Sequence, residues 1–312
     1  MNEKFEAVLK EMEKTIYGKR EQCRLVLAAL LAGGNLLLED VPGVGKTTLA
    51  LTLAHTLDLS FGRIQFTPDT LPGDITGYST VNMHTGEFIF HEGPVMNHIL
   101  LADEINRTSP KTQASLLEVM EEKQVTVEGR TMQVPTPFMV IATENPIEFS
   151  GTYQLPEAQL DRFLMRISMG YPEKEDEEAM IERSLRGEDR AMPEKVLSRE
   201  ELLTMQEEAM QVKVSEPIRR YILDIVRSTR ESRNLSLGAS PRATLALLHA
   251  AQSWAYMNGQ SYVIPEDVQA VVEPVLAHRL ILSLDASLQN ATNAGVLKEC
   301  LRVVSVPPVT ER

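Results

Sequence analysis

The stretch DVPGVGKT occupies residues 40–47, between the apolar run Asn35–Leu38 and a helical pattern that begins at Thr48. A strand, a glycine-rich turn that ends in Gly-Lys-Thr, and a helix, in this order, are typical of a phosphate-binding loop. The backbone N–H groups of such a loop and the positive end of its helix bind phosphate oxygens. Lys46 is expected to reach the β- and γ-phosphates of ATP, and Thr47 to place its hydroxyl on Mg²⁺. The residues predicted to contact ATP are Pro42, Gly43, Val44, Gly45, Lys46, Thr47 and Thr48.

Asp40 is the one departure from the usual pattern, because a glycine is expected at the first position of the loop. The backbone at residue 40 therefore should not need a conformation that only glycine adopts. The alternative interpretation of the stretch is an ordinary glycine-rich turn between a strand and a helix. The order of strand, loop and helix favours nucleotide binding.

Two adjacent carboxylates, Asp103 and Glu104, follow the apolar strand predicted at Ile99–Ala102. In open α/β sheets, ligands bind at the carboxyl ends of the strands. Because side chains alternate along a strand, Asp103 is expected to face the loop and hold Mg²⁺, usually through water, while Glu104 polarises the attacking water as a general base. The alternative is an acidic pair that only caps the following helix.

Short apolar runs alternate with helical stretches through the first half of the chain, which predicts an α/β fold with a parallel sheet. Two further segments, residues 79–90 and 125–134, predict β-hairpins that turn at His84–Gly86 and at Gly129. After Tyr171-Pro172 the strand pattern ends and long helical patterns follow. The expected domains are an α/β core at 1–172 and an all-helical domain at 173–312. The predicted strands are Asn35–Leu38, Arg63–Phe66, Ile99–Ala102, Phe138–Ala142 and Leu164–Ser168, and the predicted helices include Glu173–Arg186, Glu200–Gln211, Glu216–Arg230, Arg242–Met257 and Pro265–Ala277.

The composition indicates a folded, acidic protein: 43% of its 312 residues are hydrophobic, and its formal net charge is −13. Neither half is basic, since residues 1–172 hold 14 basic and 22 acidic side chains and residues 173–312 hold 17 and 22. This charge argues against a nucleic-acid partner. There is no run of about 18 apolar residues and no signal-peptide pattern, so we expect a cytoplasmic protein without membrane insertion. Cys23 and Cys300 have the spacing of neither a disulfide framework nor a metal site.

Three ordered motifs resemble the MoxR branch of the AAA+ ATPases: DEINR at residues 103–107, ATENP at 142–146 and LPEAQLDRF at 155–163. The stretches RIQFTPD at 63–69 and DITG at 74–77 strengthen the resemblance, which runs from about residue 17 to about residue 279. It implies an AAA+ P-loop core with a central parallel sheet and β-hairpin inserts, followed by an all-α lid domain. It also implies a homo-oligomeric, hexameric ring that couples ATP hydrolysis to chaperone-like remodelling or maturation of partner proteins.

The resemblance assigns roles to further residues. It makes Asn145 a sensor of the γ-phosphate, although Asn145-Pro146 could also simply end a strand with a turn. Arg162 is similar to the arginine finger that acts across a subunit boundary, where a permanently charged planar fork is needed. Arg242 resembles the second sensor arginine, which could act on its own subunit's site or on a neighbour's. The alternative for Arg242 is an arginine in the first turn of a helix, on a solvated face. Tyr17 and Gly18 resemble the segment that packs on the adenine base, although a turn at the start of a helix would also explain these residues.

The two predicted hairpins resemble inserts that point towards the pore of related rings, and nucleotide-driven movement of them could pull on a substrate. The alternative is that both are surface hairpins without a motor role. A helix at Glu216–Arg230 would also carry an arginine stripe, which is either a solvated face or a surface for an acidic neighbour. The stripe consists of Arg219, Arg220, Arg227, Arg230 and Arg233.

The function that these features favour is a MoxR-type, Mg²⁺-dependent ATPase whose ring acts on proteins. The resemblance implies partners with a von Willebrand factor A domain, often with a bound metal. One alternative is a nucleic-acid translocase, which the acidic charge disfavours, and another is the motor subunit of a metal chelatase. A non-enzymatic nucleotide switch is disfavoured by the presence of both Glu104 and Arg162.

Overall fold

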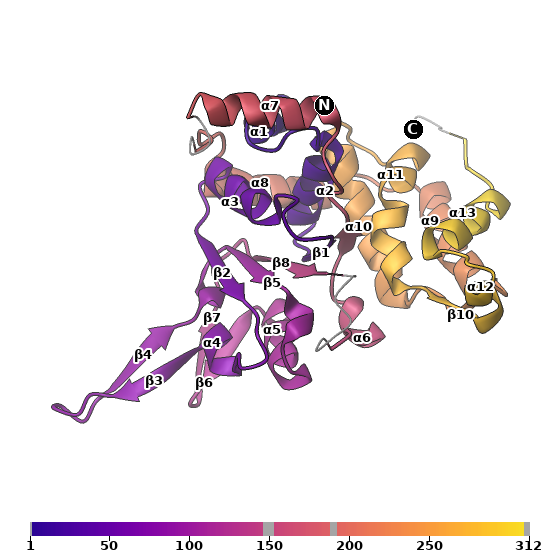
Figure 1. Ribbon diagram of the computed structural model, residues 1–312. Coiled ribbons are helices and arrows are strands. Elements are labelled where there is room, and N and C mark those ends of the chain that lie inside the picture. Colours follow the sequence, from indigo (N-terminus) through magenta and orange to yellow (C-terminus); the bar gives the residue numbers. More distant parts are fainter. Residues whose placement is uncertain (1, 146–152, 188–191, 309–312) are drawn as a thin grey trace.

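The computed structural model describes residues 2–145, 153–187 and 192–308. Its centre is a parallel sheet of five strands in the order β2-β5-β8-β1-β9 (Figure 1). Each strand overlaps a strand that the sequence predicts, and the α/β fold is confirmed. The strands are β1 (Leu36–Glu39), β2 (Phe61–Gln65), β5 (Ile99–Asp103), β8 (Met139–Glu144) and β9 (Met165–Ile167).

The apolar strands divide the core into two layers, because alternate side chains point to opposite faces of the sheet. Leu36 and Leu38 of β1 join one buried cluster, whereas Leu37 joins the other. Helices α1 (Glu3–Glu13), α2 (Arg20–Leu31) and α3 (Lys46–Thr56) cover the first face, and α4 (Pro72–Thr76) and α5 (Pro110–Glu122) cover the second (Figure 1). Strands buried on both faces explain why these runs are continuously apolar.

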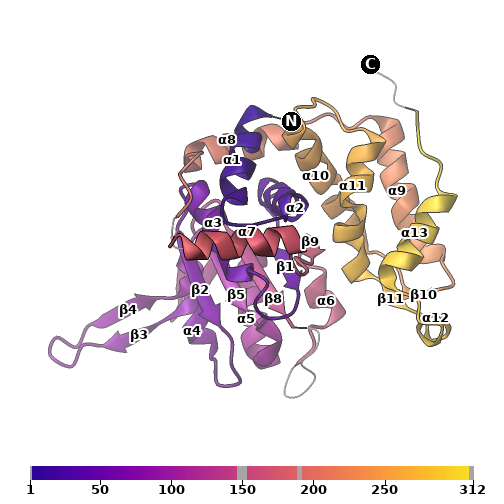
Figure 2. The same cartoon turned by 45° about the horizontal axis from the view of Figure 1, so that its top comes forward.

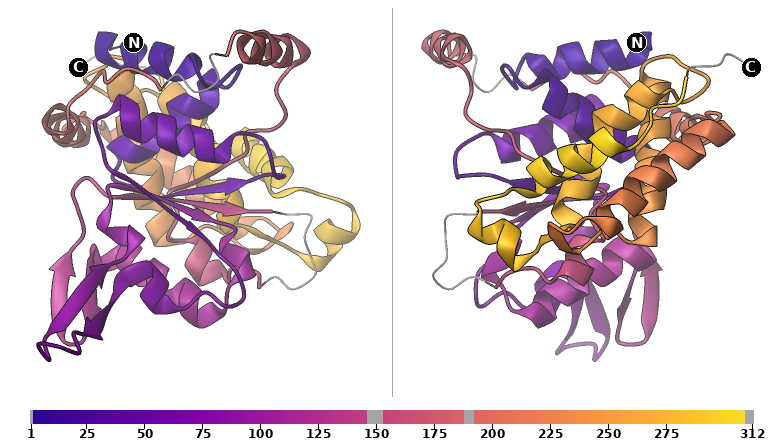
Figure 3. Two further views of the ribbon diagram at one scale, coloured as in Figure 1. Left: turned by 60° about the vertical axis from the view of Figure 1, so that its left-hand side comes forward. Right: turned by 90° about the vertical axis from the view of Figure 1, so that its right-hand side faces the viewer.

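Two antiparallel hairpins extend from the second face, as the sequence predicts. One pairs β3 (Gly77–Val81) with β4 (Phe88–Glu92), and the other pairs β6 (Gln124–Val127) with β7 (Arg130–Gln133). Both project on the same side of the molecule (Figure 3). The β3–β4 hairpin is exposed along its length, and Met83 at its tip is 91% exposed.

The second half of the chain is helical, with one addition that the sequence analysis did not expect. Two short strands, β10 (Leu235–Leu237) and β11 (Ile281–Leu282), form an antiparallel ladder, so strand structure does not end after Pro172. Three-residue and two-residue strands are too short to give a period-2 pattern. The helices are α7 (Lys174–Leu185), α8 (Arg199–Met210), α9 (Glu216–Glu231), α10 (Pro241–Met257), α11 (Pro265–Leu276), α12 (Leu284–Leu288) and α13 (Asn293–Val303) (Figure 2).

Polar contacts join this helical part to the sheet. The guanidinium of Arg279, which is 3% exposed, donates to a carboxylate oxygen of Asp161 at 2.7 Å and to the carbonyl of Phe163 at 2.7 Å. A buried arginine needs such partners, since an unpaired buried charge is very unfavourable. Within the described residues, no helix is long and apolar enough to cross a membrane.

Candidate functional site

The loop between β1 and α3 leaves open space above its backbone. Gly43 and Gly45 have positive φ angles of 88° and 89°, and no atom lies within 4 Å of the position that a Cβ would take at either residue. A side chain at these positions would be strained and would fill that space. Gly45 is also the N-cap of α3, whose first N–H groups have no partner within the helix. The loop therefore has the backbone geometry of an anion site.

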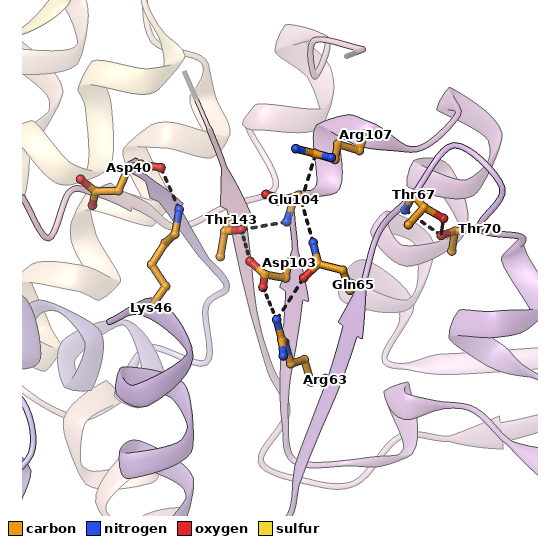
Figure 4. Close-up of polar contacts among 10 residues, drawn as sticks. All are labelled: Asp40, Lys46, Arg63, Gln65, Thr67, Thr70, Asp103, Glu104, Arg107 and Thr143. Carbon is orange, nitrogen blue, oxygen red and sulfur yellow. Dashed lines mark hydrogen bonds and ion pairs between the residues drawn. The ribbon is translucent and has the colours of Figure 1, made fainter. Parts of the chain in front are cut away.

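Lys46 bends back over this loop. Its ammonium donates to the backbone carbonyl of Asp40 at 2.8 Å (Figure 4). Burial lowers the pKa of Lys46, and the nearby carboxylates of Asp103, Asp40 and Glu104 oppose that shift. Lys46 therefore interacts electrostatically with Asp103 and Glu104 at the carboxyl end of the sheet. Thr47 is partly buried and Thr48 exposed in the first turn of α3.

Asp40 uses its carboxylate to hold the segment after β9. Its oxygens accept hydrogen bonds from the hydroxyl of Ser168 at 2.9 Å, the N–H of Gly170 at 3.2 Å and the N–H of Met169. Its own N–H donates to the carbonyl of Glu144 at 3.1 Å. Asp40 does not have a positive φ angle, so the aspartate fits where a glycine is usual. Its side chain points away from the loop and connects the loop to the chain that leads into α7.

Asp103 ends β5 with both carboxylate oxygens engaged. One accepts from the hydroxyl of Thr143 at 2.7 Å, and the other accepts from the guanidinium of Arg63 at 2.8 Å (Figure 4). Thr143 comes from β8 and Arg63 from β2, the two strands that flank β5. The side chain of Asp103 is 14% exposed, whereas that of Arg63 is 47% exposed. The carboxylate is thus fixed by the sheet and paired with the half-exposed side chain of Arg63.

Glu104 turns away from Asp103 through a left-handed backbone conformation, with φ 57° and ψ 52°. Such a conformation is unfavourable for a residue other than glycine and is often found at functional sites. The carboxylate accepts from the side-chain amide of Gln65 at 2.6 Å and pairs with Arg107 at 3.0 Å. The backbone N–H of Glu104 donates to Thr143 at 2.8 Å. Gln65 and Arg107 therefore fix the direction of this carboxylate, and Thr143 fixes the backbone of Glu104.

The sequence analysis gave Arg63, Gln65, Arg107 and Thr143 no role at this site. A signal for two of them is present, because Arg63 and Gln65 are polar residues two positions apart in a strand. They lie on one face of β2 and are bonded to each other at 3.0 Å. Thr143 is completely buried at the end of β8, where a hydroxyl needs a partner.

Asn145 follows β8 directly and is buried, with 6% of its surface exposed. It lies at the same edge of the sheet as the acidic pair, since β8 is the neighbour of β5. Pro146, which would form the alternative turn with it, lies outside the described residues. The preceding Glu144 is largely buried. Burial and, secondly, the carboxylate of Glu39 raise its pKa to about 7.

Arg162 and Arg242 come together on a single carboxylate, that of Glu121 on α5. Arg162 pairs with one oxygen of Glu121 at 2.9 Å, and Arg242 donates to the other. Arg242, and then Arg162, hold the pKa of Glu121 below its usual value. Neither arginine forms a hydrogen bond or ion pair with Asp103 or Glu104 in the described part of the chain. The two arginines are therefore bonded to Glu121 and not to the acidic pair.

Asp161 fixes the loop that carries Arg162. Besides binding Arg279, its carboxylate accepts a hydrogen bond from the hydroxyl of Ser240 at 3.0 Å. Ser240 is the N-cap of α10 and stands two residues before Arg242. One carboxylate thus ties together the two segments from which the arginines arise.

Tyr17 and Gly18 lie under helix α7. The hydroxyl of Tyr17 accepts from Arg183 at 3.3 Å. Gly18 has a φ of 64°, and a Cβ on it would lie 1.8 Å from a carboxylate oxygen of Asp176. The positive φ favours glycine here, and the carboxylate of Asp176 occupies the space beside it.

One cavity of about 430 Å³ lies between the core and the helical part, next to the start of the loop. Its walls include Glu39 and Ser168 from the sheet and Glu273 and Asn293 from the helical part. A wider cavity of about 750 Å³ lies among α8, the end of α10 and the N-terminus, and it contains none of the predicted site residues. We place the candidate site by its side-chain chemistry and not by cavity size.

Comparison with known proteins agrees with this geometry. Residues 35–165 match the model of the ATPase family associated with various cellular activities (AAA), and residues 227–299 match the AAA lid domain. The chain is 42% identical to Chaperone MoxR1 of Mycobacterium tuberculosis over 98% of its length and 83% of that protein's. It is 46% identical to the uncharacterised protein YeaC of Bacillus subtilis, over 96% and 93% of the two chains.

Two further similarities extend the comparison. Protein MoxR of Paracoccus denitrificans is 31% identical, with 86% of each chain covered. A crystal structure from Cytophaga hutchinsonii, of a protein described as a candidate ATPase, superimposes with a TM-score of 0.92 at 38% identity. That superposition covers 98% of this chain and 96% of the other.

Proposed function

Because the chain belongs to the MoxR family of AAA+ ATPases, we propose that it hydrolyses Mg²⁺-ATP in a head-to-tail ring and uses the energy to remodel or mature partner proteins. The observation that carries the proposal is the fixed acidic pair. Asp103 and Glu104 are held by residues of β2 and β8, the strands on either side of β5, at the edge of the sheet where the glycine-rich loop also begins.

The residues present fit ATP and its cation. The open backbone at Gly43 and Gly45 suits the phosphates, and the ammonium of Lys46 could exchange its hydrogen bond to the carbonyl of Asp40 for one to a phosphate oxygen. Thr47 and Asp103 offer a hydroxyl and a carboxylate, which are the oxygen ligands that Mg²⁺ prefers. Bound Mg²⁺ would neutralise charge on the phosphate oxygens.

Glu104 is the residue that we assign to proton abstraction from the attacking water. Gln65, Arg107 and the αL backbone aim its carboxylate away from Asp103, so the two acids have separate tasks. We assign Asn145 to orienting water or binding the γ-phosphate through its amide. Tyr17 and Gly18 would contact the base, with α7 above them.

We assign Arg162 and Arg242 together to the neighbouring subunit's nucleotide. Their shared partner Glu121 places both guanidinium groups on one surface of the subunit, apart from its own acidic pair. A finger that completes another subunit's site requires a head-to-tail contact, which closes into a ring when repeated about an axis. A hexamer is the ring that we expect from the family.

The target of the motor is proposed to be protein. The relative named Chaperone MoxR1 supports such a role. The β3–β4 hairpin exposes Tyr78, Met83 and Phe88 by 53%, 91% and 64%, which would allow apolar contact with a polypeptide. We expect a partner with a von Willebrand factor A domain. We also propose that residues 1–172 act as the ATPase core and residues 173–312 as the lid.

The test of the proposal is the variant Glu104→Gln. It keeps the shape of the side chain and the metal ligand Asp103, so ATP binding should persist while hydrolysis falls at least about a hundredfold. Calorimetry would measure the first and phosphate release the second. Turnover near the wild-type rate would place the general base elsewhere. The same variant, trapped with ATP and used as bait, should retain a protein partner.

A further inference from the structure

Helix α7 is almost uncovered. None of its 12 residues is buried, although a helix of this length is only marginally stable without packing. Ile181 and Leu185 lie one turn apart on the same face and are 61% and 84% exposed. The exposed Glu177 and Glu178 lie one turn before Ile181. The outer face of α7 is thus an apolar pair with an acidic border.

The inner face of α7 rests on the segment that we assign to the adenine base. Asp176 lies against Gly18, and Arg183 donates to Tyr17 at 3.3 Å. Just before the helix, the carbonyl of Tyr171 accepts from Lys19 at 2.7 Å. These contacts place α7 on the nucleotide side of the subunit.

Helix α9 carries a surface of opposite charge. Its inner face is buried, but Leu223 on its outer face is 48% exposed. Arg219 and Arg227 lie one turn on either side of Leu223, and Arg230 lies two turns after it, all exposed. Of the acidic residues on α9, Glu216 is already paired with Arg220 at 2.6 Å, whereas Asp224 and Glu231 lie at the edge of the arginine face. The outer face of α9 is thus an apolar residue with a basic border.

Contacts within the chain tie α9 to the arginines proposed to act on the neighbour. Arg230 donates to the carbonyl of Ala239 at 2.8 Å, and a Cβ on Gly238 would lie 2.7 Å from the backbone of Arg230. The segment 238–240 leads directly to Arg242 in the first turn of α10. Helix α9 therefore lies on the arginine side of the subunit.

The two surfaces are complementary, but they cannot meet within one chain. Figures 1 and 3 show α7 and α9 at opposite sides of the molecule. Two different surfaces on opposite sides can pair only between copies, which gives a head-to-tail contact. Such a contact would bring the nucleotide side of one copy to the arginine side of the next.

We propose that the outer face of α7 packs against the outer face of α9 in an adjacent copy of the chain. Ile181 and Leu185 cover Leu223, and the glutamates of α7 pair with the arginines of α9. This gives the arginine stripe an occupant and explains why α7 lacks a cover in the isolated chain. The inference rests on the proposed ring, but a ring could also close through other surfaces without this contact.

Cross-linking between copies tests the contact directly. Subunits with Leu185→Cys are mixed with subunits with Leu223→Cys, in the presence of a slowly hydrolysed ATP analogue and a short bis-maleimide. The native Cys23 and Cys300 are buried, so they do not compete. We expect a cross-linked pair of the two variants. A matched mixture with Met83→Cys, at an exposed hairpin tip far from both helices, should give no such pair.

Charge reversal tests the polar border. Arg227→Glu and Glu178→Arg should each raise the concentration for half assembly at least about threefold, measured by sedimentation velocity. Combined in one chain, the two reversals should restore assembly towards the wild-type concentration. If the double variant assembles even less well than either single variant, the proposed pairing is wrong.

The outcomes separate this contact from the ring itself. Lys46→Ala and Arg162→Ala subunits that recover activity on mixing, without any cross-link between residues 185 and 223, would show a ring that closes through other surfaces. That result overturns the α7–α9 contact alone. Absence of the cross-link together with absence of assembly in sedimentation velocity would overturn the contact and the ring together. Equal cross-linking to the Met83→Cys control would also overturn the contact.

Discussion

Arg63 pairs with the carboxylate that we assign to Mg²⁺, and this pairing makes it a competitor of the cation. Its guanidinium lies 2.8 Å from Asp103 and is half-exposed, so it can leave without losing a buried contact. A positive charge this close disfavours a second cation at the same oxygen.

Arg63→Met should therefore strengthen cation binding at the site. The variant keeps a long apolar stem and removes the charge, and we expect divalent-ion affinity in the presence of ATP to rise by about two- to tenfold. Titration of Mn²⁺ followed by electron paramagnetic resonance measures this without relying on turnover. Unchanged Mn²⁺ binding would mean that Arg63 does not compete with the cation, and weaker binding would mean that Arg63 helps to build the cation site.

Individual residues show where sequence reasoning stops. The roles of Lys46 and of the acidic pair follow from their place after predicted strands, because strand ends meet at one edge of a parallel sheet. Glu121 could not be assigned in this way. It is an exposed residue near the end of α5, and its two arginine partners are 41 and 121 residues away in sequence. Contacts of that range depend on packing that no local pattern encodes.

The end of β8 holds a carboxyl whose protonation affects stability near neutral pH. Burial, and then the carboxylate of Glu39, raise the pKa of Glu144 from 4.5 to about 7, against the opposing effect of Arg166. Between these two values the folded state binds more protons than the unfolded state. Stability therefore falls as the pH rises from about 4.5 to about 7 and then levels off.

Glu144→Gln removes this dependence, since an amide does not ionise. The variant should gain stability relative to the wild type as the pH is raised from 5 to 8, by roughly 1–3 kcal/mol. Urea unfolding of both proteins at the two pH values measures the difference. A constant difference across this range would show that Glu144 is ionised normally in the folded protein.

At the level of elements, the strands and the long helices could be predicted from the sequence. The helices show a clear apolar period, and the strands of the central sheet are continuous apolar runs. In β5 and β8, every residue from Ile99 to Ala102 and from Met139 to Thr143 is buried. The short β10–β11 ladder and α12 could not be predicted in the same way, because they are too short to show a period and tertiary contacts decide their conformation. Helix α13 has an apolar face with Val296, Leu297 and Cys300, but it was not predicted from the sequence.

The molecule as a whole is acidic, and this bears on what its motor can act on. Its formal net charge is −13, and the arginines of α9 share their helix with Glu216, Asp224 and Glu231. Counterion release on nucleic acid needs several clustered cations on one surface. The charge therefore disfavours nucleic acid as the substrate of the motor.

Neither duplex nor single-stranded DNA should bind at physiological salt or raise ATP turnover. Fluorescence anisotropy with labelled DNA at about 0.15 M salt measures binding, and phosphate release with and without DNA measures stimulation. Low-salt binding that disappears at this ionic strength would be non-specific. Strong stimulation of turnover by DNA at physiological salt would favour a translocase.

The central claim is that one subunit completes the site of the next, and mixing two inactive variants tests it most directly. Lys46→Ala removes the phosphate-binding ammonium but keeps Arg162. Arg162→Ala keeps the loop and should bind ATP almost normally, yet hydrolyse it poorly, because the guanidinium stabilises transition-state charge.

In mixed assemblies, some intact arginines face intact loops. The ATPase activity of the mixture should therefore rise well above that of either variant alone, and it should increase with protein concentration. Size-exclusion chromatography of tagged subunits would establish that mixed assemblies form. If they form and the mixture stays as inactive as its two components, Arg162 does not act across a subunit boundary, and its pairing with Glu121 is structural.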